Sequence, residues 1–213
     1  MKDNVFLSSD TVWSVSDLLI GSVFNSINIF PATELVRSLT FKVPGLTPGN
    51  YYLIAKTDVS NNIFETDENN NTTVSLSTIY IDLPELPIEV LLNDTLRNME
   101  EKHYRLIIPD SLKGESMITY LTGDSAHGIN ELYMTNNEIS TRMNHDYSHL
   151  NPFLANQEVL VPSLDSGSYY LLAYGHTSTA LFQEITLFAD ILEFEIRNIH
   201  NNKGGNNGTA TIL

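Results

Sequence analysis

The residues best suited to chemistry lie in one acidic stretch in the first half of the chain. Residues 58–70 hold four carboxylates and four asparagines within 13 positions. Calcium takes about six to eight oxygen ligands from carboxylates, amides and backbone carbonyls in flexible loops. We expect a calcium site there, with ligands from Asp58, Asn62, Glu65, Glu68 and Asn70. Asp10 and Asp17 of an earlier loop are further candidates. The alternative is a hairpin whose Asp and Asn side chains bind their own backbone, since the spacing is not that of an EF-hand.

Two other groups of residues resemble reactive sites. Residues 123–125, Gly-Asp-Ser, with His127 nearby, are similar to the serine block of GDS-type esterases. A serine nucleophile needs a positioned base and an oxyanion hole, and this block lies between short strands, which favours a turn. His145 and His149 have the spacing that grips zinc on a helix, but neighbouring Asn and Pro residues favour a loop. We therefore predict no catalytic residue and no enzyme activity.

Aromatic residues offer a third kind of site, a platform on which sugars stack. Tyr51, Tyr52, Tyr169 and Tyr170 form two adjacent pairs. In a strand, neighbouring side chains point to opposite faces, so one ring of each pair should face a core. Trp13, the single tryptophan, is expected to anchor its loop against a sheet.

Composition narrows the classes of partner. The formal net charge is −15, from 26 acidic against 11 basic residues, which disfavours binding to nucleic acid or to anionic lipid. The chain has no cysteine, so disulfides, thiolate metal sites and cysteine nucleophiles are excluded. No stretch is long and apolar enough for a membrane helix, and no signal region follows Met1-Lys2-Asp3-Asn4.

The elements that must position these residues are short strands. Apolar residues alternate with polar ones in several segments, and helical periodicity is nearly absent. The sets with one apolar face are Leu35, Leu39, Phe41 and Val43; Val74 and Leu76; Tyr104, Leu106 and Ile108; Ile185, Leu187 and Ala189; Leu192, Phe194 and Ile196. Gly-, Asn- and Pro-rich turns separate them, which predicts β-sandwiches.

A repeated segment indicates two domains. Residues 43–55 and 161–173 share the pattern VP, L, G, YYL, A. It describes a turn with a Gly at positive φ, followed by a central buried strand. We predict an all-β protein of two tandem sandwiches, immunoglobulin-like or jelly-roll-like. The expected divisions are residues 1–81, a Pro-bearing linker 82–87, residues 88–197, and a linker with the start of a further module at 198–213.

The first domain resembles a known bacterial family. The residues that carry the likeness are Phe6-Leu7-Ser8-Ser9-Asp10, Asp17, Pro48-Gly49-Asn50-Tyr51-Tyr52-Leu53, and the acidic segment 58–70. On these motifs, residues 5–77 resemble CARDB, a cell adhesion related β-sandwich domain found in bacteria. The family normally has one or two strands before the matching segment, so we expect a first sandwich truncated at its N-terminus.

The second domain resembles a bacterial pre-peptidase C-terminal module. The matching pieces are Tyr104 to Pro109, Glu131-Leu132-Tyr133, Asn156 to Pro162 and Gly167 to Leu171. Such modules are jelly-roll-like sandwiches attached to secreted enzymes and adhesins.

Both resemblances imply a non-catalytic adhesion and spacer pair from a large secreted or surface-anchored bacterial protein, stiffened by calcium. The alternative is a carbohydrate-binding accessory module of a secreted hydrolase. Expected partners are neighbouring domains of the same chain and an extracellular polysaccharide or surface protein, without nucleic acid and without membrane insertion. The expected location is extracellular or at the cell surface.

Overall fold

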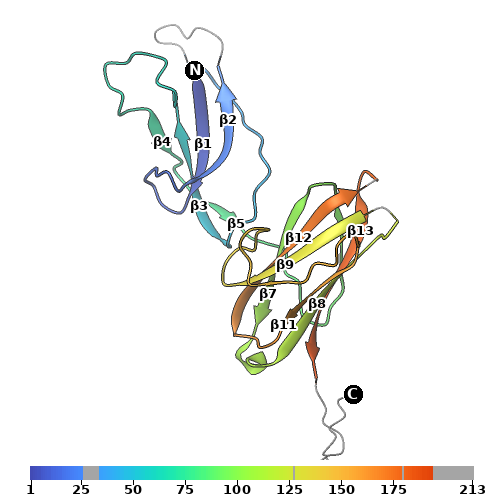
Figure 1. The fold of residues 1–213 in the computed structure, drawn as a ribbon. Helices are drawn as coiled ribbons and strands as arrows, with labels where there is room; N and C mark the ends of the chain where they lie inside the picture. The colour runs from blue at the N-terminus through green and yellow to red at the C-terminus, as the bar shows by residue number, and fades with distance from the viewer. Residues whose placement is uncertain (26–33, 127, 179, 194–213) are drawn as a thin grey trace, which may run out of the picture. The chain divides into compact units, whose positions relative to one another are not determined.

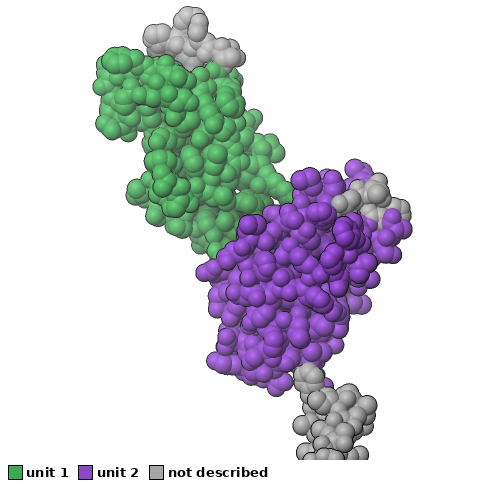
Figure 2. Space-filling view, viewed as in Figure 1, with its two compact units in different colours: residues 1–83 green, residues 84–213 purple. Residues whose placement is uncertain are grey.

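The protein is all-β, as the sequence predicts (Figure 1). The computed structural model describes residues 1–25, 34–126, 128–178 and 180–193. The chain divides into two compact units, Met1–Leu83 and Pro84–Leu213, coloured green and purple in Figure 2. This boundary falls inside the Pro-bearing segment 82–87. In the described part of the chain, no helix has the length and apolarity needed to cross a membrane.

The described residues of the first unit form one antiparallel sheet. Its strands are β1 (Lys2–Ser8), β2 (Leu18–Phe24), β3 (Gly49–Lys56), β4 (Thr72–Val74) and β5 (Ile79–Ile81). Their order is β2-β1-β3-β4, and β5 also pairs with β3. Phe6 lies opposite Ile54 and Leu7 opposite Leu53 in the central β1–β3 pair. These residues therefore supply one of the two sheets that a sandwich requires.

Two loops cover the faces of this sheet. The Trp13 ring packs edge-on against Phe6 with 6.1 Å between centroids, and Lys56 Nζ lies 3.7 Å above the indole. Trp13 thus anchors its loop, as expected. Leu39 packs over Gly21, where a Cβ would lie 2.7 Å from the leucine Cδ2. Glycine at this position lets the 34–47 segment approach the opposite face closely.

Residues 34–47 contain no strand, so the prediction of a strand through Leu35 and Val43 is wrong. The alternation did predict which side chains are buried. Leu35, Leu39 and Phe41 are half-buried, while Val36 is 86% exposed. Burial on one side does not require backbone pairing, and this segment packs through its side chains instead.

The predicted inward orientation of Leu76 is also wrong, because its side chain is fully exposed. Strand β4 ends at Val74. The Ser75 hydroxyl then accepts a hydrogen bond from Leu53 N at 3.1 Å and donates to Ser77 O at 2.8 Å. A side chain that replaces a backbone group in this way ends the ladder.

The second unit is a two-sheet sandwich. Its strands are β6 (Leu92–Leu96), β7 (Glu101–Ile108), β8 (Ser116–Gly123), β9 (Gly128–Asn136), β10 (Tyr147–Ser148), β11 (Gln157–Val161), β12 (Gly167–Ser178) and β13 (Gln183–Leu192), with a 3₁₀ turn at Asp110–Leu112. One sheet has the order β10-β9-β12-β7 and the other β11-β8-β13-β6. Leu86 is fully buried in this unit, and Glu85 bridges to Arg105.

The core of the second unit follows the predicted alternation. Tyr104, Leu106 and Ile108 of β7 are buried, as are Ile185, Leu187 and Ala189 of β13. These two strand predictions are confirmed. Strand β13 ends at Leu192, and the predictions for Phe194, Ile196 and residues 198–213 lie outside the described residues.

The repeated segment forms the same corner in both units. Tyr51 Oη donates to Thr47 O at 2.7 Å, and Tyr169 Oη accepts from Asp165 N at 3.0 Å. Each tyrosine thus reaches back four residues to the backbone of its own turn, the arrangement known as a tyrosine corner. Both following strands, β3 and β12, pair on two sides. The repeat therefore encodes a turn and a central strand, as predicted, but the expected Gly at positive φ is present only in the second copy, at Gly167 with φ of +126°, and not at Gly49.

Candidate functional site

Asp58 is the buried centre of the predicted calcium loop. It follows β3 with φ of +41° and is 4% exposed. Its carboxylate accepts hydrogen bonds from Asn62 N at 3.1 Å and Ile63 N at 2.8 Å. These bonds fold residues 58–63 into a tight turn, which is the alternative that the sequence left open.

The other predicted ligands are more exposed. Glu68 Oε1 accepts from Glu65 N at 3.0 Å, and Glu68 Oε2 from Asn71 Nδ2 at 3.4 Å. Asn62 and Asn70 are exposed. Among the described residues, no three His, Asp or Glu side chains gather closely enough to hold a metal ion. The five-residue calcium site stays a prediction.

Sequence reasoning missed the residue that contacts Asp58 across the sheet. Asp3 Oδ1 accepts from Asp58 N at 3.1 Å, and Asp3 Oδ2 accepts from Asn25 Nδ2 at 2.6 Å. The antiparallel β1–β3 register brings them together, since Asn4 lies opposite Lys56. Only the pairing of these strands could have revealed this contact.

Asp10 and Asp17 do not join this group. They follow the other end of β1, about 20 Å away at about 3.3 Å per residue. There Asp10 Oδ1 accepts from Val12 N and Asp17 Oδ2 from Ser14 N, both at 2.7 Å. Their role is to close the 9–17 loop.

The Gly-Asp-Ser segment is the turn between β8 and β9. Asp124 Oδ1 accepts from Ala126 N at 2.9 Å, and Asp124 O accepts from Gly128 N at 2.9 Å. Ser125 is exposed, and His127 lies outside the described residues. The turn interpretation of this segment agrees with these bonds.

His145 and His149 serve different neighbours. His145 packs its ring on Tyr133 at 4.6 Å between centroids. His149 Nδ1 lies 3.5 Å from Glu158 Oε1 on β11. The two histidines flank the short strand β10 rather than sharing a helix face, so the loop interpretation agrees with the structure.

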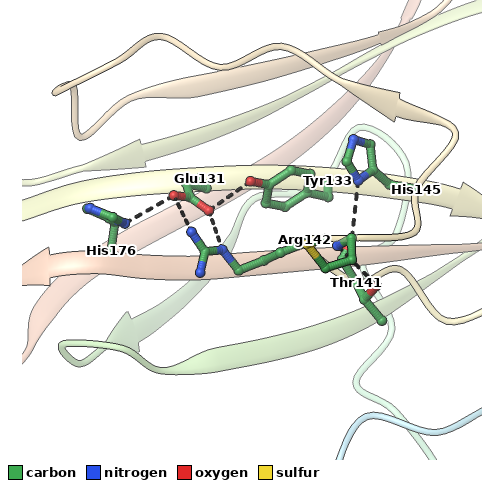
Figure 3. A network of polar contacts seen from close by, with 7 residues as sticks. Glu131, Tyr133, Thr141, Arg142, His145 and His176 are labelled. Carbon is green, nitrogen blue, oxygen red and sulfur yellow. Dashed lines mark hydrogen bonds and ion pairs between the residues drawn. The ribbon is translucent and has the colours of Figure 1, made fainter.

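The densest polar network lies around Glu131 on β9 (Figure 3). Arg142 binds its carboxylate with two nitrogens, Nε at 2.6 Å and Nη2 at 2.9 Å. Tyr133 Oη donates to Glu131 Oε2 at 2.8 Å, and His176 Nδ1 lies 3.1 Å from Oε1. The Arg142 guanidinium also stacks 4.1 Å from the centre of the Tyr174 ring.

The electrostatics of this network favour structure over catalysis. Burial alone would raise the pKa of Glu131, but Arg142 and Tyr133 outweigh it and hold that pKa below its ordinary value. Burial and the neighbouring carboxylate raise the pKa of Tyr133 to about 12. Glu131 therefore stays ionised with both oxygens occupied, and Tyr133 stays protonated as a donor.

The network fastens a strap, residues 137–146, over the outer face of the β10-β9-β12-β7 sheet. Ser140 is fully buried and its carbonyl lies 3.0 Å from His103 Nε2. Tyr133, Tyr170 and Tyr174 of that face are at most 7% exposed. As predicted, Tyr169 faces the core and Tyr170 the other side, and neither ring is open to a sugar.

Comparisons with known proteins locate one family. Residues 4–75 match the family model of CARDB, which confirms the resemblance predicted for residues 5–77. No curated protein matches the chain.

Two solved structures are similar to part of the chain. The first is the pre-peptidase C-terminal domain of collagenase from Bacillus anthracis, with 12% identity and a TM-score of 0.39, covering 51% of this chain and 94% of that one. The second is PliG from Aeromonas hydrophila, a periplasmic inhibitor of g-type lysozyme, with 12% identity and a TM-score of 0.33, covering 50% of this chain and 96% of that one.

Proposed function

We propose that the chain is a non-catalytic adhesion and spacer unit of a large secreted or surface-anchored bacterial protein. The observation that carries this proposal is the CARDB match over residues 4–75, because this family is related to bacterial cell adhesion. Its partners would be neighbouring domains of the same protein and a polysaccharide or protein on an extracellular surface.

A spacer must transmit force through separately folded units. The test is single-molecule extension of the full chain held at its two ends. Unit 1, Met1–Leu83, should release roughly 300 Å of contour at about 3.6 Å per residue when it unfolds. A second, longer step should follow from unit 2. Extension without resolved steps would contradict the spacer role.

Adhesion is tested with the full chain coupled to inert beads. Such beads should be retained under flow on bacterial or host surfaces coated with extracellular polymer, and beads bearing an unrelated acidic protein should not. Equal retention of both beads would contradict the adhesion role.

The alternative, a carbohydrate-binding accessory module, gains nothing from the tyrosine pair of the second unit. Tyr169 is fully buried and Tyr170 is 7% exposed. A sugar-binding face would have to use other aromatic residues.

Calcium binding to the 58–70 loop is the second part of the proposal. An ion that binds only the folded state raises the free energy of unfolding by RT ln(1 + [L]/Kd). This is about 2.7 kcal/mol when the ion is at a hundredfold excess over Kd. Millimolar calcium should raise the unfolding temperature of the first unit, and EDTA should reverse the rise. Asp58→Asn should abolish the calcium response, whereas Asp10→Asn should keep it. An unfolding curve unchanged by calcium would remove this part of the proposal.

A further inference from the structure

The outer face of the β11-β8-β13-β6 sheet carries a row of side chains that the core does not use. Met117 and Leu121 of β8 point into the core, as do Ile185 and Leu187 of β13. Because side chains alternate along a strand, the residues between them point outward. The outward residues are Ile118, Tyr120 and Thr122 on β8, Glu184, Thr186, Phe188 and Asp190 on β13, Glu158 and Leu160 on β11, and Asn93 on β6.

An aromatic pair occupies the middle of this face. Tyr120 and Phe188 lie directly opposite each other on β8 and β13, so both side chains leave the sheet on the same face. Tyr120 is 36% exposed and Phe188 is half-buried. On β11, Leu160 lies opposite Ile118 and is 48% exposed, which extends the apolar strip.

Hydrogen-bonding groups border the aromatic pair. Thr122 lies opposite Thr186 in the next outward row, and Thr186 Oγ1 donates to Asn93 Oδ1 at 2.9 Å. The two threonines also line an open hollow of about 470 Å³, together with Asp124, Phe182, Glu184 and neighbouring residues. Phe182 is 46% exposed at this hollow. Figure 1 shows β8, β11 and β13 in this sandwich.

The charge of this face limits the classes of ligand that it can bind. None of the strands β6, β8, β11 and β13 contains Lys or Arg, while Glu158, Glu184 and Asp190 point outward and Asp124 borders the hollow. An acidic polymer would be repelled. Carboxylates, threonine hydroxyls and an asparagine amide instead accept hydrogen bonds from hydroxyl groups.

We propose that this face binds an uncharged polysaccharide laid across β8 and β13. Tyr120 and Phe188 would receive the apolar faces of sugar rings, and Thr122, Thr186, Asn93 and the carboxylates would bind sugar hydroxyls. Sugar rings present an apolar face and a polar edge, so they fit an aromatic pair that is bordered by hydrogen-bond acceptors. This inference deepens the proposed function, on which it rests, because it names what the module adheres to.

The test is migration of the full chain in native gels that contain one polysaccharide each. Hydroxyethyl cellulose, glucomannan and a neutral xylan represent uncharged polymers, chitosan represents a cationic one and polygalacturonate an acidic one. We expect retardation by at least one neutral polymer that persists in high salt. Tyr120→Ala and Phe188→Ala should each weaken that binding roughly tenfold.

Two further variants keep the test decisive. Phe188→Leu retains apolar bulk without the ring and should still lose binding, while its thermal unfolding shows whether the sandwich remains folded. Tyr80→Ala removes a ring that is 64% exposed on the first unit and should leave binding unchanged.

Three results would overturn the inference. They are unaltered migration in every neutral gel, retardation by chitosan alone that salt abolishes, and an equal loss for Tyr80→Ala. None of them would alter the stepwise extension that tests the spacer role, and a failed extension experiment would leave gel retardation unaffected.

Discussion

Asp94 on β6 is a half-buried carboxylate of the second unit with three hydrogen-bond donors. It accepts hydrogen bonds from Lys102 Nζ at 2.6 Å, the Tyr104 hydroxyl at 2.7 Å and Thr95 N at 2.7 Å. Burial alone would raise its pKa, but these donors outweigh burial and hold the pKa of Asp94 below its ordinary value. Burial and Asp94 together raise the pKa of Tyr104 well above its ordinary value. The pair therefore fixes a 1% exposed tyrosine at the edge of the core.

Replacing Asp94 with Ala should lower the free energy of unfolding of the second unit by about 1–3 kcal/mol, because the buried Tyr104 hydroxyl loses its acceptor. A carboxyl with a depressed folded pKa stabilises the fold above its unfolded pKa of about 3.9, and this stabilisation is lost as pH falls through the folded value. Urea unfolding at pH 7, 5 and 3 should thus show a difference between wild type and variant that shrinks toward pH 3. Asp190→Ala, on the outer face, should change stability by less than about 0.5 kcal/mol. A pH-independent difference would contradict the assignment.

The two tyrosine corners differ in burial and should differ in strength. Tyr169 is fully buried, and Tyr169→Phe leaves the Asp165 N–H without its acceptor, which should cost about 1–2 kcal/mol. Tyr51 is only half-buried, and water can replace its hydroxyl, so Tyr51→Phe should cost less. Chemical denaturation of each variant measures both losses. Equal losses would mean that burial does not set the strength of the corner.

At the scale of elements, the strap 137–146 depends on Arg142. Arg142→Met keeps the aliphatic length but removes both bonds to Glu131 and the stacking on Tyr174. We expect faster amide hydrogen exchange across the strap and an unfolding free energy lower by about 1–3 kcal/mol. Lys113→Met removes only an exposed ion pair of 3.8 Å to Asp165 and should change stability by less than about 1 kcal/mol. Unchanged exchange in Arg142→Met would show that the strap is held by other contacts.

The strands and loops also show which features of the fold could be predicted from the sequence. Strands β7 and β13 were predictable because their two faces differ in environment, and alternation records that difference. The 34–47 segment has the same alternation but does not pair with a strand. A segment that packs on the face of a sheet is buried on one side, just as a strand inside the sheet is. The acidic loop was visible as a run of carboxylates, but its contact with Asp3 spans 55 positions. The Tyr120–Phe188 pair was hidden for the same reason, because only the strand register places these two residues opposite each other on one face.

At the scale of the molecule, the two units have unequal cores. In the described part of the first unit, Leu7, Ile54 and Ile81 are the buried apolar side chains, whereas many large ones are exposed, such as Phe24 and Leu76. The second unit has a continuous core that spans both of its sheets. Stability scales with the apolar area removed from water, so the first unit should be the weaker one.

The single tryptophan makes this difference measurable, because Trp13 belongs to the first unit. In urea, the Trp13 fluorescence transition should precede the loss of far-ultraviolet circular dichroism from the second unit. Leu187→Ala should shift only the later transition, by about 2–5 kcal/mol, and Ile54→Ala only the earlier one. Coincident transitions in the wild type would contradict independent units.

The absence of basic residues from β6, β8, β11 and β13 has a practical side. The lysines outside these strands are Lys2, Lys42, Lys56, Lys102, Lys113 and Lys203. Reagents that attach proteins to beads, sensor chips or fluorophores through primary amines will therefore not react at the strands that carry Tyr120 and Phe188. A protein immobilised through its lysines keeps that face chemically unmodified. Ligand binding can therefore be compared between tethered and free protein without engineering another attachment site.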